Sequence, residues 1–312
     1  MSANLGDQFG LANGHLLTKA FAWFYFAINV GAFGSVMVTP WLLEHYGPGL
    51  AFGVPGILMF VATVIFWSGR THYVHIPPDW SGVLQALSSR QAWRAIGKLA
   101  GIYVFVAFFW SLYDQTASAW VLQAQHMDRV WMGVEWLPSQ IQAVNPVLIM
   151  VFIPLFTYVV YPVLNRMVLL TSLRKMGMGF FLTVGAFLIS AYIEQQIDLG
   201  MEPAIGWQLL AFVVITAAEV MVSITCLEFS YSQAPLKLKS LLMGLFLLSV
   251  SLGNGFTAFV NYWIQNTDGT VVLPGPDYYW FFAGVMFLVA CLFLLVVKGY
   301  EEETYLQVTG RG

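Results

Sequence analysis

Long runs of apolar residues recur along the whole chain, separated by short stretches that carry most of the charge. A helix needs about 20 mostly apolar residues to cross a bilayer core of about 30 Å. The runs are continuous rather than alternating, so they predict helices and not the strands of a membrane barrel. Eight segments fit this pattern: 20–43, 50–68, 100–122, 143–164, 178–195, 207–231, 240–264 and 278–298. The sequence therefore predicts an all-α polytopic membrane protein.

Composition supports this interpretation. The chain has 312 residues, of which 59% are hydrophobic and 9% charged, and its mean hydropathy is +0.72. A soluble domain averages about 45–50% apolar and about 25% charged residues. Too few polar side chains are present to cover a water-facing globule, which argues against an ordinary soluble enzyme. A net charge of −3 provides no basic field for nucleic acid.

Basic residues gather in alternate gaps between the predicted spans. When the N-terminal segment is counted as the first gap, every Lys and Arg except Arg129 falls in an odd-numbered gap. Loops rich in Lys and Arg stay on the cytoplasmic side. We therefore expect an integral protein of the cell (inner or plasma) membrane with both termini in the cytoplasm.

The spans also suggest a division of the chain. Residues 1–68 hold two spans, 69–99 form a cytoplasmic linker, 100–298 form a six-helix bundle and 299–312 form a cytoplasmic tail. Within the linker, 80–99 has apolar residues at helical spacing with basic residues between them. This pattern predicts an amphipathic helix on the membrane surface, and an ordinary linker is the alternative.

Glu219 is the most informative polar residue within a span. It lies about 18 Å into the span that begins near Trp207, at about 1.5 Å per residue, which is the middle of the bilayer. Thr216, Ser223 and Ser230 are spaced to share its face. An acid at the centre of a membrane helix costs about 2.5–3.5 kcal/mol, so such residues usually face a cavity or a partner. We expect this stripe to line a cavity or a helix interface.

Two other acids fall within spans. Asp114 lies past the midplane toward the outside, on one stripe with Trp110 and Ser118. An acid, an indole and a hydroxyl on one face suit a polar organic substrate; an interfacial Trp beside a helix-end acid is the alternative. Glu228 lies near the cytoplasmic end, on the side of its helix opposite Glu219, and either a functional role or a salt bridge to a basic loop explains it.

Two asparagines complete the polar set. Asn29 lies within the first predicted span, and Asn145 precedes Pro146. Pro154 and Pro162 follow on the same helix, so this helix should bend more than once. Transporters place binding sites near bent or broken helices. For either asparagine, substrate contact and hydrogen bonding between helices both remain open.

No catalytic or metal-binding motif accompanies the spans. No predicted span contains histidine, and the sequence has no HExxH, Walker or TVGYG motif. The sequence therefore lacks the residues that an intramembrane hydrolase, an ATP-driven pump or a potassium channel needs for its function. We therefore expect no enzyme activity, no metal and no cofactor.

Five blocks of sequence, quoted in order, carry a resemblance to a known family. They are FYFAINVGA (24–32), FWSLYDQTASAWVLQA (109–124), PSQIQAVNPVLIMVFIP (138–154), EVMVSITCLEFSYSQAP (219–235) and SLGNGF (251–256). In these blocks the chain resembles the proton-dependent oligopeptide transporter (POT) family of the major facilitator superfamily.

The resemblance implies a partial fold. Members have twelve spans in two six-helix halves, and the eight spans here align as the fifth to twelfth. The chain would then hold the last two helices of the N-terminal half and the complete C-terminal half. The first-span ExxERFxYYG and the GGxKP motifs are absent. A separate chain that supplies the first four spans is therefore an expected partner.

The resemblance also implies roles for individual residues. Glu219 would hold the amino terminus of a peptide, and Ser223 shares its face. The expected substrate-binding residues are Glu219, Asn145, Asn29, Trp110, Phe246 and Ser223. The expected residues for proton coupling and gating are Asp114, Glu219 and Lys98. Thr157 stands where the family has the acidic partner of Lys98.

The function implied is proton-coupled symport of di- and tripeptides by alternating access, incomplete in this chain without the first four spans. Protons would be the coupling ion, and the small peptide and the lipid bilayer would be the partners. Two alternatives stay open. One is a proton-coupled transporter of an amino acid or a nitrate-like solute, and the other is a non-transporting fragment.

Overall fold

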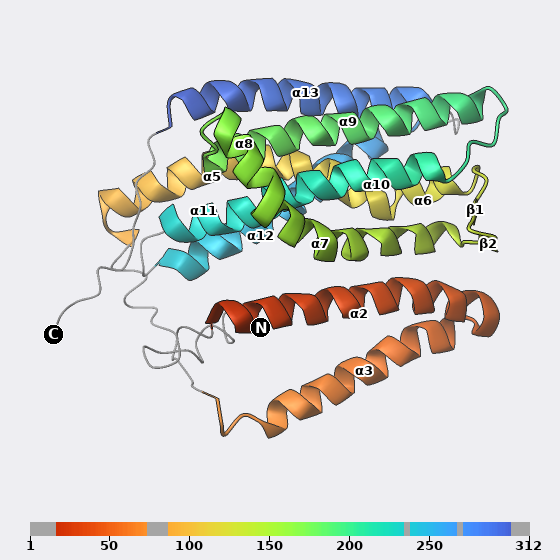
Figure 1. Ribbon diagram of the computed structural model, residues 1–312, viewed down its shortest axis with the longest axis horizontal. Coiled ribbons are helices and arrows are strands. Elements are labelled where there is room, and N and C mark those ends of the chain that lie inside the picture. Colours follow the sequence, from red (N-terminus) through yellow and green to blue (C-terminus); the bar gives the residue numbers. More distant parts are fainter. Residues whose placement is uncertain (1–16, 74–86, 234–237, 267–270, 301–312) are drawn as a thin grey trace. The chain divides into compact units, whose positions relative to one another are not determined.

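A computed structural model describes residues 17–73, 87–233, 238–266 and 271–300 (Figure 1). Within these ranges, eight helical spans are long and apolar enough to cross a membrane, as predicted. The chain divides into two compact units: Met1–Asp79 with Ser139–Met150, and Trp80–Pro138 with Val151–Gly312. We call them the first unit and the second unit and describe each by itself.

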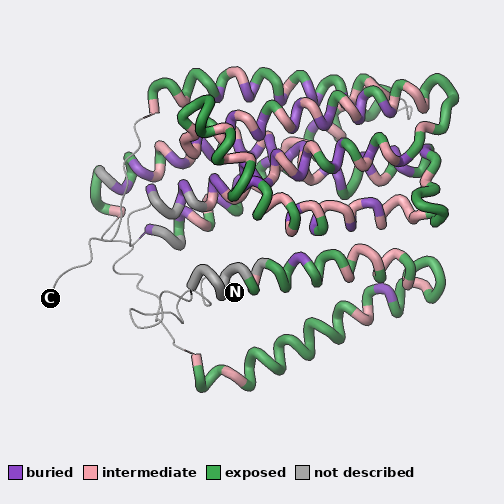
Figure 2. Tube along the Cα trace, viewed as in Figure 1, coloured by how far each residue is buried: buried purple, intermediate pink, exposed green. Residues whose placement is uncertain are grey.

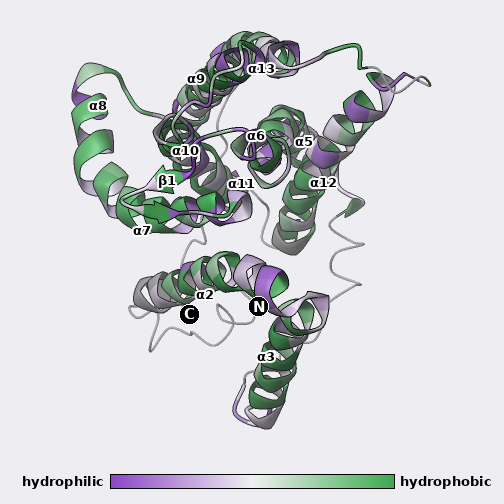
Figure 3. Ribbon diagram, turned by 90° about the vertical axis from the view of Figure 1, so that its right-hand side faces the viewer, coloured by the Kyte–Doolittle hydropathy of each residue, from purple (hydrophilic) through white to green (hydrophobic). Residues whose placement is uncertain are grey.

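The first unit contains a pair of helices joined by a one-residue turn. Helix α2 spans Leu17–Tyr46 and α3 spans Pro48–Ser68. Between them Gly47 has φ 79°, a conformation that glycine adopts without steric cost, and Pro48 starts α3 with its φ already helical. Helix α3 is hydrophobic over most of its length (Figure 3), and most of its residues are exposed (Figure 2). This composition suits a helix surrounded by lipid or by other helices.

A segment distant in sequence joins this unit. Helix η3 (Pro138–Ala143) leads into α7 (Val144–Leu155), and Gln140 Nε2 donates a hydrogen bond of 2.9 Å to the Met37 carbonyl of α2.

The second unit contains the other described elements. They are α5 (Arg90–Tyr113), η2 (Asp114–Ala117), α6 (Ala119–Ala124), β1 (Val130–Trp131), β2 (Val134–Glu135), η4 (Phe156–Val160), α8 (Tyr161–Met167), α9 (Ser172–Asp198), α10 (Gly206–Glu219), η5 (Val220–Ile224), α11 (Thr225–Gln233), α12 (Lys239–Trp263) and α13 (Pro276–Lys298). Helix α9 packs along both α10 and α13, and α12 packs along α5 (Figure 1).

The core of the second unit centres on α9. Met176, Phe180 and Phe187 are fully buried, and Phe180 meets Phe293 of α13 edge to face with ring centroids 4.9 Å apart. Figure 2 shows buried residues running along α9, α10 and α5. Aromatic pairs in this geometry stabilise packing beyond the area that they bury.

Residues 90–99, which the sequence suggested would lie on the membrane surface, form the first turns of α5. Ser89 begins the helix by accepting a hydrogen bond of 3.1 Å from the Ala92 amide. The apolar stripe of this segment, at Ala92, Ala95 and Leu99, is buried in the bundle. Residues 74–86 of the predicted linker and 301–312 of the predicted tail lie outside the described residues.

A short β-hairpin follows α6, which the apolar pattern did not predict. Strands β1 and β2 are antiparallel, with Val130 opposite Glu135. The two-residue turn has positive φ at both positions, 54° at Met132 and 79° at Gly133. This is the type I′ geometry that matches the twist of paired strands.

Candidate functional site

Glu219 lies where an α-helix gives way to a wider turn. It is the last residue of α10, and the π-helical segment η5 begins at Val220. Such segments inside α-helices are rare and occur often at functional sites, because they re-aim side chains and loosen the regular hydrogen-bond ladder. The Glu219 side chain is half-buried, as is Ser223 within the wide turn, while Thr216 is buried. The side chain of Glu228 is outside the described set.

A second π-helical segment packs against the first. Phe156 opens η4, and it forms one buried cluster with Val220 and Met221 of η5. Pro154 and Pro162 flank η4, and Pro162 has no N–H to donate to the helical ladder just after it. The sequence predicts that the prolines bend this helix more than once; the structure shows a π-helical segment between Pro154 and Pro162, and it lies against the segment that follows Glu219.

Ser230 does not extend the polar stripe as the simple helical spacing predicted. Its hydroxyl donates to the Cys226 carbonyl at 2.6 Å and accepts from the Tyr103 hydroxyl at 2.8 Å. The wide turn η5 lies between Glu219 and Ser230, so the regular period of 3.6 residues does not hold across it. Ser230 joins α11 to α5.

Phe246 is packed against the same tyrosine. The two rings meet edge to face with centroids 6.1 Å apart, and Phe246 is 4% exposed. The Leu242 carbonyl oxygen lies 3.4 Å from the same Tyr103 hydroxyl, as a weaker second acceptor of its one hydrogen. In this conformation Phe246 forms part of the contact between α5 and α12.

Trp110 carries an unsatisfied donor. Its ring meets Phe109 and Tyr113 edge to face, each at 5.3 Å between centroids. Its Nε1 is buried and has no hydrogen-bond partner among the described residues. A buried donor without an acceptor costs free energy, and a bound water or ligand atom would satisfy it.

Asp114 follows the last residue of α5, begins η2 and has a neutral partner. Asn254 of α12 donates a hydrogen bond of 2.6 Å to Asp114 Oδ2. The sequence indicated Asp114 but not Asn254. The signal was present in the block SLGNGF, where a polar amide sits inside an apolar helix between two glycines.

Close contact between α5 and α12 fixes this pair. A Cβ on Gly253 would meet the Ala107 carbonyl and would lie 2.8 Å from the Ser111 amide nitrogen. One turn further, the hydroxyls of Ser111 and Thr257 are 2.7 Å apart, and Thr257 also donates to the Ser111 carbonyl at 3.0 Å. Because the backbones touch here, Asn254 reaches Asp114 directly.

The other predicted residues are placed as follows. Asn29 on α2 is 7% exposed and Asn145 on α7 is half-buried, and both belong to the first unit. Lys98 lies with its Nζ 5.7 Å from the centre of the Tyr300 ring, within cation–π range. Thr157 donates to the Ile153 carbonyl at 2.7 Å, so its hydroxyl is engaged within its own helix.

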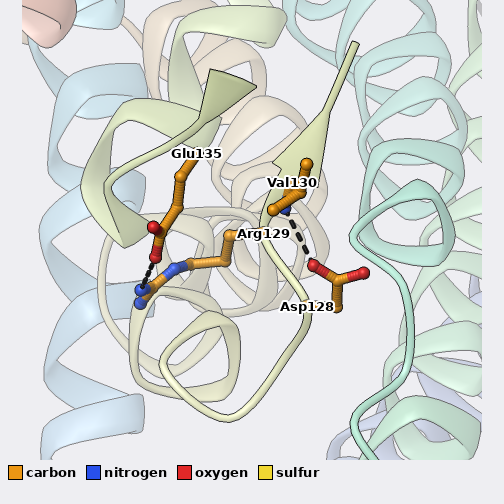
Figure 4. A network of polar contacts seen from close by, with 4 residues as sticks. All are labelled: Asp128, Arg129, Val130 and Glu135. Atoms are coloured by element: carbon orange, nitrogen blue, oxygen red, sulfur yellow. Dashed lines mark hydrogen bonds and ion pairs between the residues drawn. The ribbon is translucent and has the colours of Figure 1, made fainter. Parts of the chain in front are cut away.

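A pocket of about 490 Å³ lies elsewhere in the second unit, between the chain after α6 and the connection from α9 to α10. Its lining includes Asp128, Arg129 and Glu135, which Figure 4 shows beside Val130. Arg129 pairs with Glu135 at 2.9 Å, and Asp128 Oδ1 accepts from the Val130 amide at 3.0 Å. None of the predicted site residues lines this pocket.

Two backbone hydrogen bonds frame that pocket. The Asp128 amide donates to the Pro203 carbonyl at 3.1 Å, and the Ile205 amide donates to the Asp128 carbonyl at 2.8 Å. The chain after α6 and the chain before α10 are thus tied together by a parallel β-bridge between Asp128 and Ala204.

Comparison with known proteins finds matches to one family of transporters. The model of the POT family matches residues 1–90 and 85–281. The chain is 32% identical over 249 residues to Peptide transporter 3 of Caenorhabditis elegans, covering 66% of this chain and 36% of that protein. It is 32% identical over 263 residues to Solute carrier family 15 member 2 of Rattus norvegicus, covering 71% of this chain and 36% of that protein.

Solved structures agree. The crystal structure of an auto-inhibited POT family peptide transporter matches with a TM-score of 0.85 and 30% identity, over 98% of this chain and 75% of that one. The in meso crystal structure of the POT family transporter PepTSo also has a TM-score of 0.85, with 32% identity, over 96% of this chain and 74% of that one.

These matches confirm the predicted fold class, an all-α integral membrane protein with part of the major facilitator superfamily fold. The relatives are transporters and not enzymes, as the sequence indicated. The chain spans about 36% of the length of the curated relatives quoted above. It belongs to the POT family.

Proposed function

We propose that this chain takes part in proton-coupled symport of di- and tripeptides by alternating access. The observation that carries the proposal is Glu219, a half-buried carboxylate in the middle of a membrane span, at the start of a π-helical segment. A peptide zwitterion needs a negative group for its ammonium, and a carboxylate in a low-dielectric site attracts that charge more strongly than one in water does.

The remaining substrate contacts are proposed from residue chemistry. Trp110 and Phe246 would supply an apolar wall, and the unsatisfied Trp110 Nε1 would donate to a peptide carbonyl. Asn29, Asn145 and Ser223 would hydrogen-bond the peptide backbone. Phe246 would have to separate from Tyr103 to reach a substrate, so we assign the present packing to a state without open access to that ring.

Proton coupling is proposed at two acids. In one state Asp114 is held by the neutral amide of Asn254, and in another a cationic group would replace that amide. Protonation of Asp114 or Glu219 would weaken such ion pairs and allow one half to rock against the other. Lys98 would act at the inner gate, where Tyr300 now lies beside it.

This chain spans only part of the length of its curated relatives, about 36% of those proteins. We propose that the first four spans of the family fold, supplied by a separate chain, complete the pathway. We also propose that the chain lies in the cell membrane and that both of its termini are in the cytoplasm. No cofactor is invoked, since a proton gradient supplies the driving force.

The test is uptake into proteoliposomes. With the chain and a co-expressed segment that supplies the first four spans, an inward proton gradient should drive uphill uptake of labelled dialanine. Glu219→Gln should abolish the uphill component, because the amide carries no charge for the ammonium. Glu135→Gln, which removes an exposed acid of the hairpin, is the matched control and should transport normally.

Competition separates the alternatives. Unlabelled dialanine should compete with the labelled peptide far better than free alanine or nitrate does, and the reverse order would favour transport of another solute. Uptake that is unchanged in Glu219→Gln would contradict the proposed role of that carboxylate. Absence of uptake by wild type with the added segment would favour a non-transporting fragment.

A further inference from the structure

Glu194 is an acid that the transport site does not use. It lies on α9, four residues before the end of that helix, and its side chain is half-buried. Gln123 of α6 donates from Nε2 to Glu194 Oε2 at 2.7 Å and to the Ser190 carbonyl at 3.0 Å. Glu194 lies one turn from the end of the candidate span Ser172–Asp198, and an ionisable side chain within a membrane span suggests a function by default.

The surroundings of this pair contain more acceptors than donors. Gln123 is 2% exposed, and both hydrogens of its amide are used by the two bonds above. Its Oε1 is buried and has no donor among the described residues. Within the described part of the chain, Glu194 makes no ion pair closer than 4.0 Å, so a neutral amide is what holds its negative charge.

Three other titratable groups face Glu194. Asp198 lies one turn further along α9, and His126 lies just after α6. Tyr279 of α13 is the third, and its hydroxyl donates to the Ala119 carbonyl at 3.1 Å. Asp198 adds a negative charge and Tyr279 has its own acceptor. The His126 ring makes no hydrogen bond to Glu194 or to Gln123 Oε1 among the described residues, so none of the three supplies the missing donor.

The pocket described above adjoins this cluster. His126 lines it, and so does Ile197, three residues after Glu194 and therefore on an adjacent part of the same helix face. In the described residues no group of three His, Cys, Asp or Glu side chains could hold a metal ion. A proton is the cation that a single carboxylate beside an unpaired amide oxygen can bind.

We propose that Glu194, held by Gln123, is a proton-binding site loaded from this pocket. A hydronium ion in the pocket gives its proton to a Glu194 carboxylate oxygen and leaves as water. The new O–H is the donor that the cluster lacks, and protonation removes the charge that the neutral Gln123 only partly compensates. This site is separate from Glu219, and it does not depend on which solute the chain carries.

Infrared difference spectroscopy tests the proposal on the wild-type chain in lipid nanodiscs. The bath is stepped from about pH 8 to about pH 4, a range that brackets the usual glutamate pKa of about 4.3. Wild type should gain a carboxyl carbonyl band from a shielded acid. That band should be absent in Glu194→Gln and should move in frequency in Glu194→Asp, because the shorter acid absorbs differently. Both variants should elute as wild type does on size exclusion.

Gln123→Leu and Asp277→Asn complete the design. Gln123→Leu removes the donor but keeps the acid, so the band should persist at a higher frequency. Asp277→Asn removes an exposed acid of α13 and should leave the shielded band unchanged. Identical difference spectra for wild type, Glu194→Gln and Glu194→Asp would overturn the proposal, and a band unmoved in Gln123→Leu would overturn the assignment of Gln123. The readout needs no transported peptide, so failure of the proposed transport would leave it intact.

Discussion

The contact at Gly253 shows how much one missing side chain determines. The backbones of α5 and α12 approach so closely that a Cβ at this position would meet the Ala107 carbonyl. Asp114 and Asn254 are held together as a consequence, with a hydrogen bond of 2.6 Å. A glycine in an apolar helix is ordinary in a membrane protein, and only the packing shows that this one is required.

We expect Gly253→Ala to destabilise the folded protein by about 1–3 kcal/mol, the usual cost of overfilling a packed contact. Gly255→Ala is the matched control, because a Cβ there would meet nothing within 4 Å. Thermal unfolding of both variants in the same detergent measures the difference. Equal unfolding temperatures for the two variants would contradict the close contact.

Tyr103 and Ser230 provide a second test at this scale. Tyr103→Phe removes the 2.8 Å bond between their hydroxyls and should cost about 0.5–1.5 kcal/mol. Ser230→Ala should cost little more once Tyr103 is already phenylalanine, because the two changes remove the same bond. A double-mutant cycle of unfolding free energies checks this, and strictly additive values would show that the bond contributes nothing.

At the residue scale the sequence predicted which side chains are unusual but not what holds them. Glu219, Asp114 and Trp110 stood out because polar groups are costly in apolar helices. Asn254, Gln123 and Glu194 were missed as partners because their contacts join residues far apart in the chain. Glu194 also fell at the edge of a predicted span and therefore looked like a loop acid.

Among the elements, helix ends follow rules that the sequence contains. Ser89 caps α5 and Thr171 caps α9 in the same way, each hydroxyl oxygen accepting a hydrogen bond from a first-turn amide. The predicted span that begins at residue 100 was too short at its start because the preceding basic residues suggested a surface helix. The apolar stripe of residues 90–99 packs in the bundle instead, while Arg94 and Trp93 remain exposed.

Ser89→Ala should therefore destabilise the start of α5 by about 0.5–2 kcal/mol, whereas Ser89→Asp should keep most of the stability because its carboxylate also accepts the Ala92 amide. Hydrogen exchange of the first-turn amides of α5 is the measurement. If Ser89→Ala exchanges as slowly as wild type, the cap has no energetic role.

The two π-helical segments could not be predicted from the apolar period. A span in which one turn contains an extra residue has nearly the same hydropathy as a regular helix. The average hydropathy over a window therefore does not reveal the wider turn. The prolines around η4 indicated a bend, but nothing in the sequence around η5 distinguishes it from an ordinary helix.

On the scale of the whole molecule, the number of spans and the family were predictable, because both rest on long stretches of sequence rather than on single contacts. The sidedness of the membrane is a prediction from charge alone. It places the hairpin outside and the residues after α3 inside, and this can be tested with positions that the structure describes as exposed.

Met132→Cys and Thr71→Cys form the matched pair for that test. Met132 is 90% exposed at the hairpin tip, and Thr71 is exposed after α3. A membrane-impermeant thiol reagent should label Met132→Cys in intact cells and Thr71→Cys only after permeabilisation. Wild type should stay largely unlabelled, since Cys226 is buried and Cys291 is half-buried within a span. Labelling of Thr71→Cys in intact cells would reverse the orientation.

The wide turn after Glu219 has one more consequence. Because η5 accommodates an extra residue without ending the helix, removing Val222 would let the segment relax to an ordinary α-helix while the parts on either side keep their faces. The same deletion one turn into α10, where no slack exists, would rotate everything beyond it by about 100°. Tolerance to a shortened chain should thus be confined to a few positions, and evolution could have gained or lost a residue there without rebuilding the bundle.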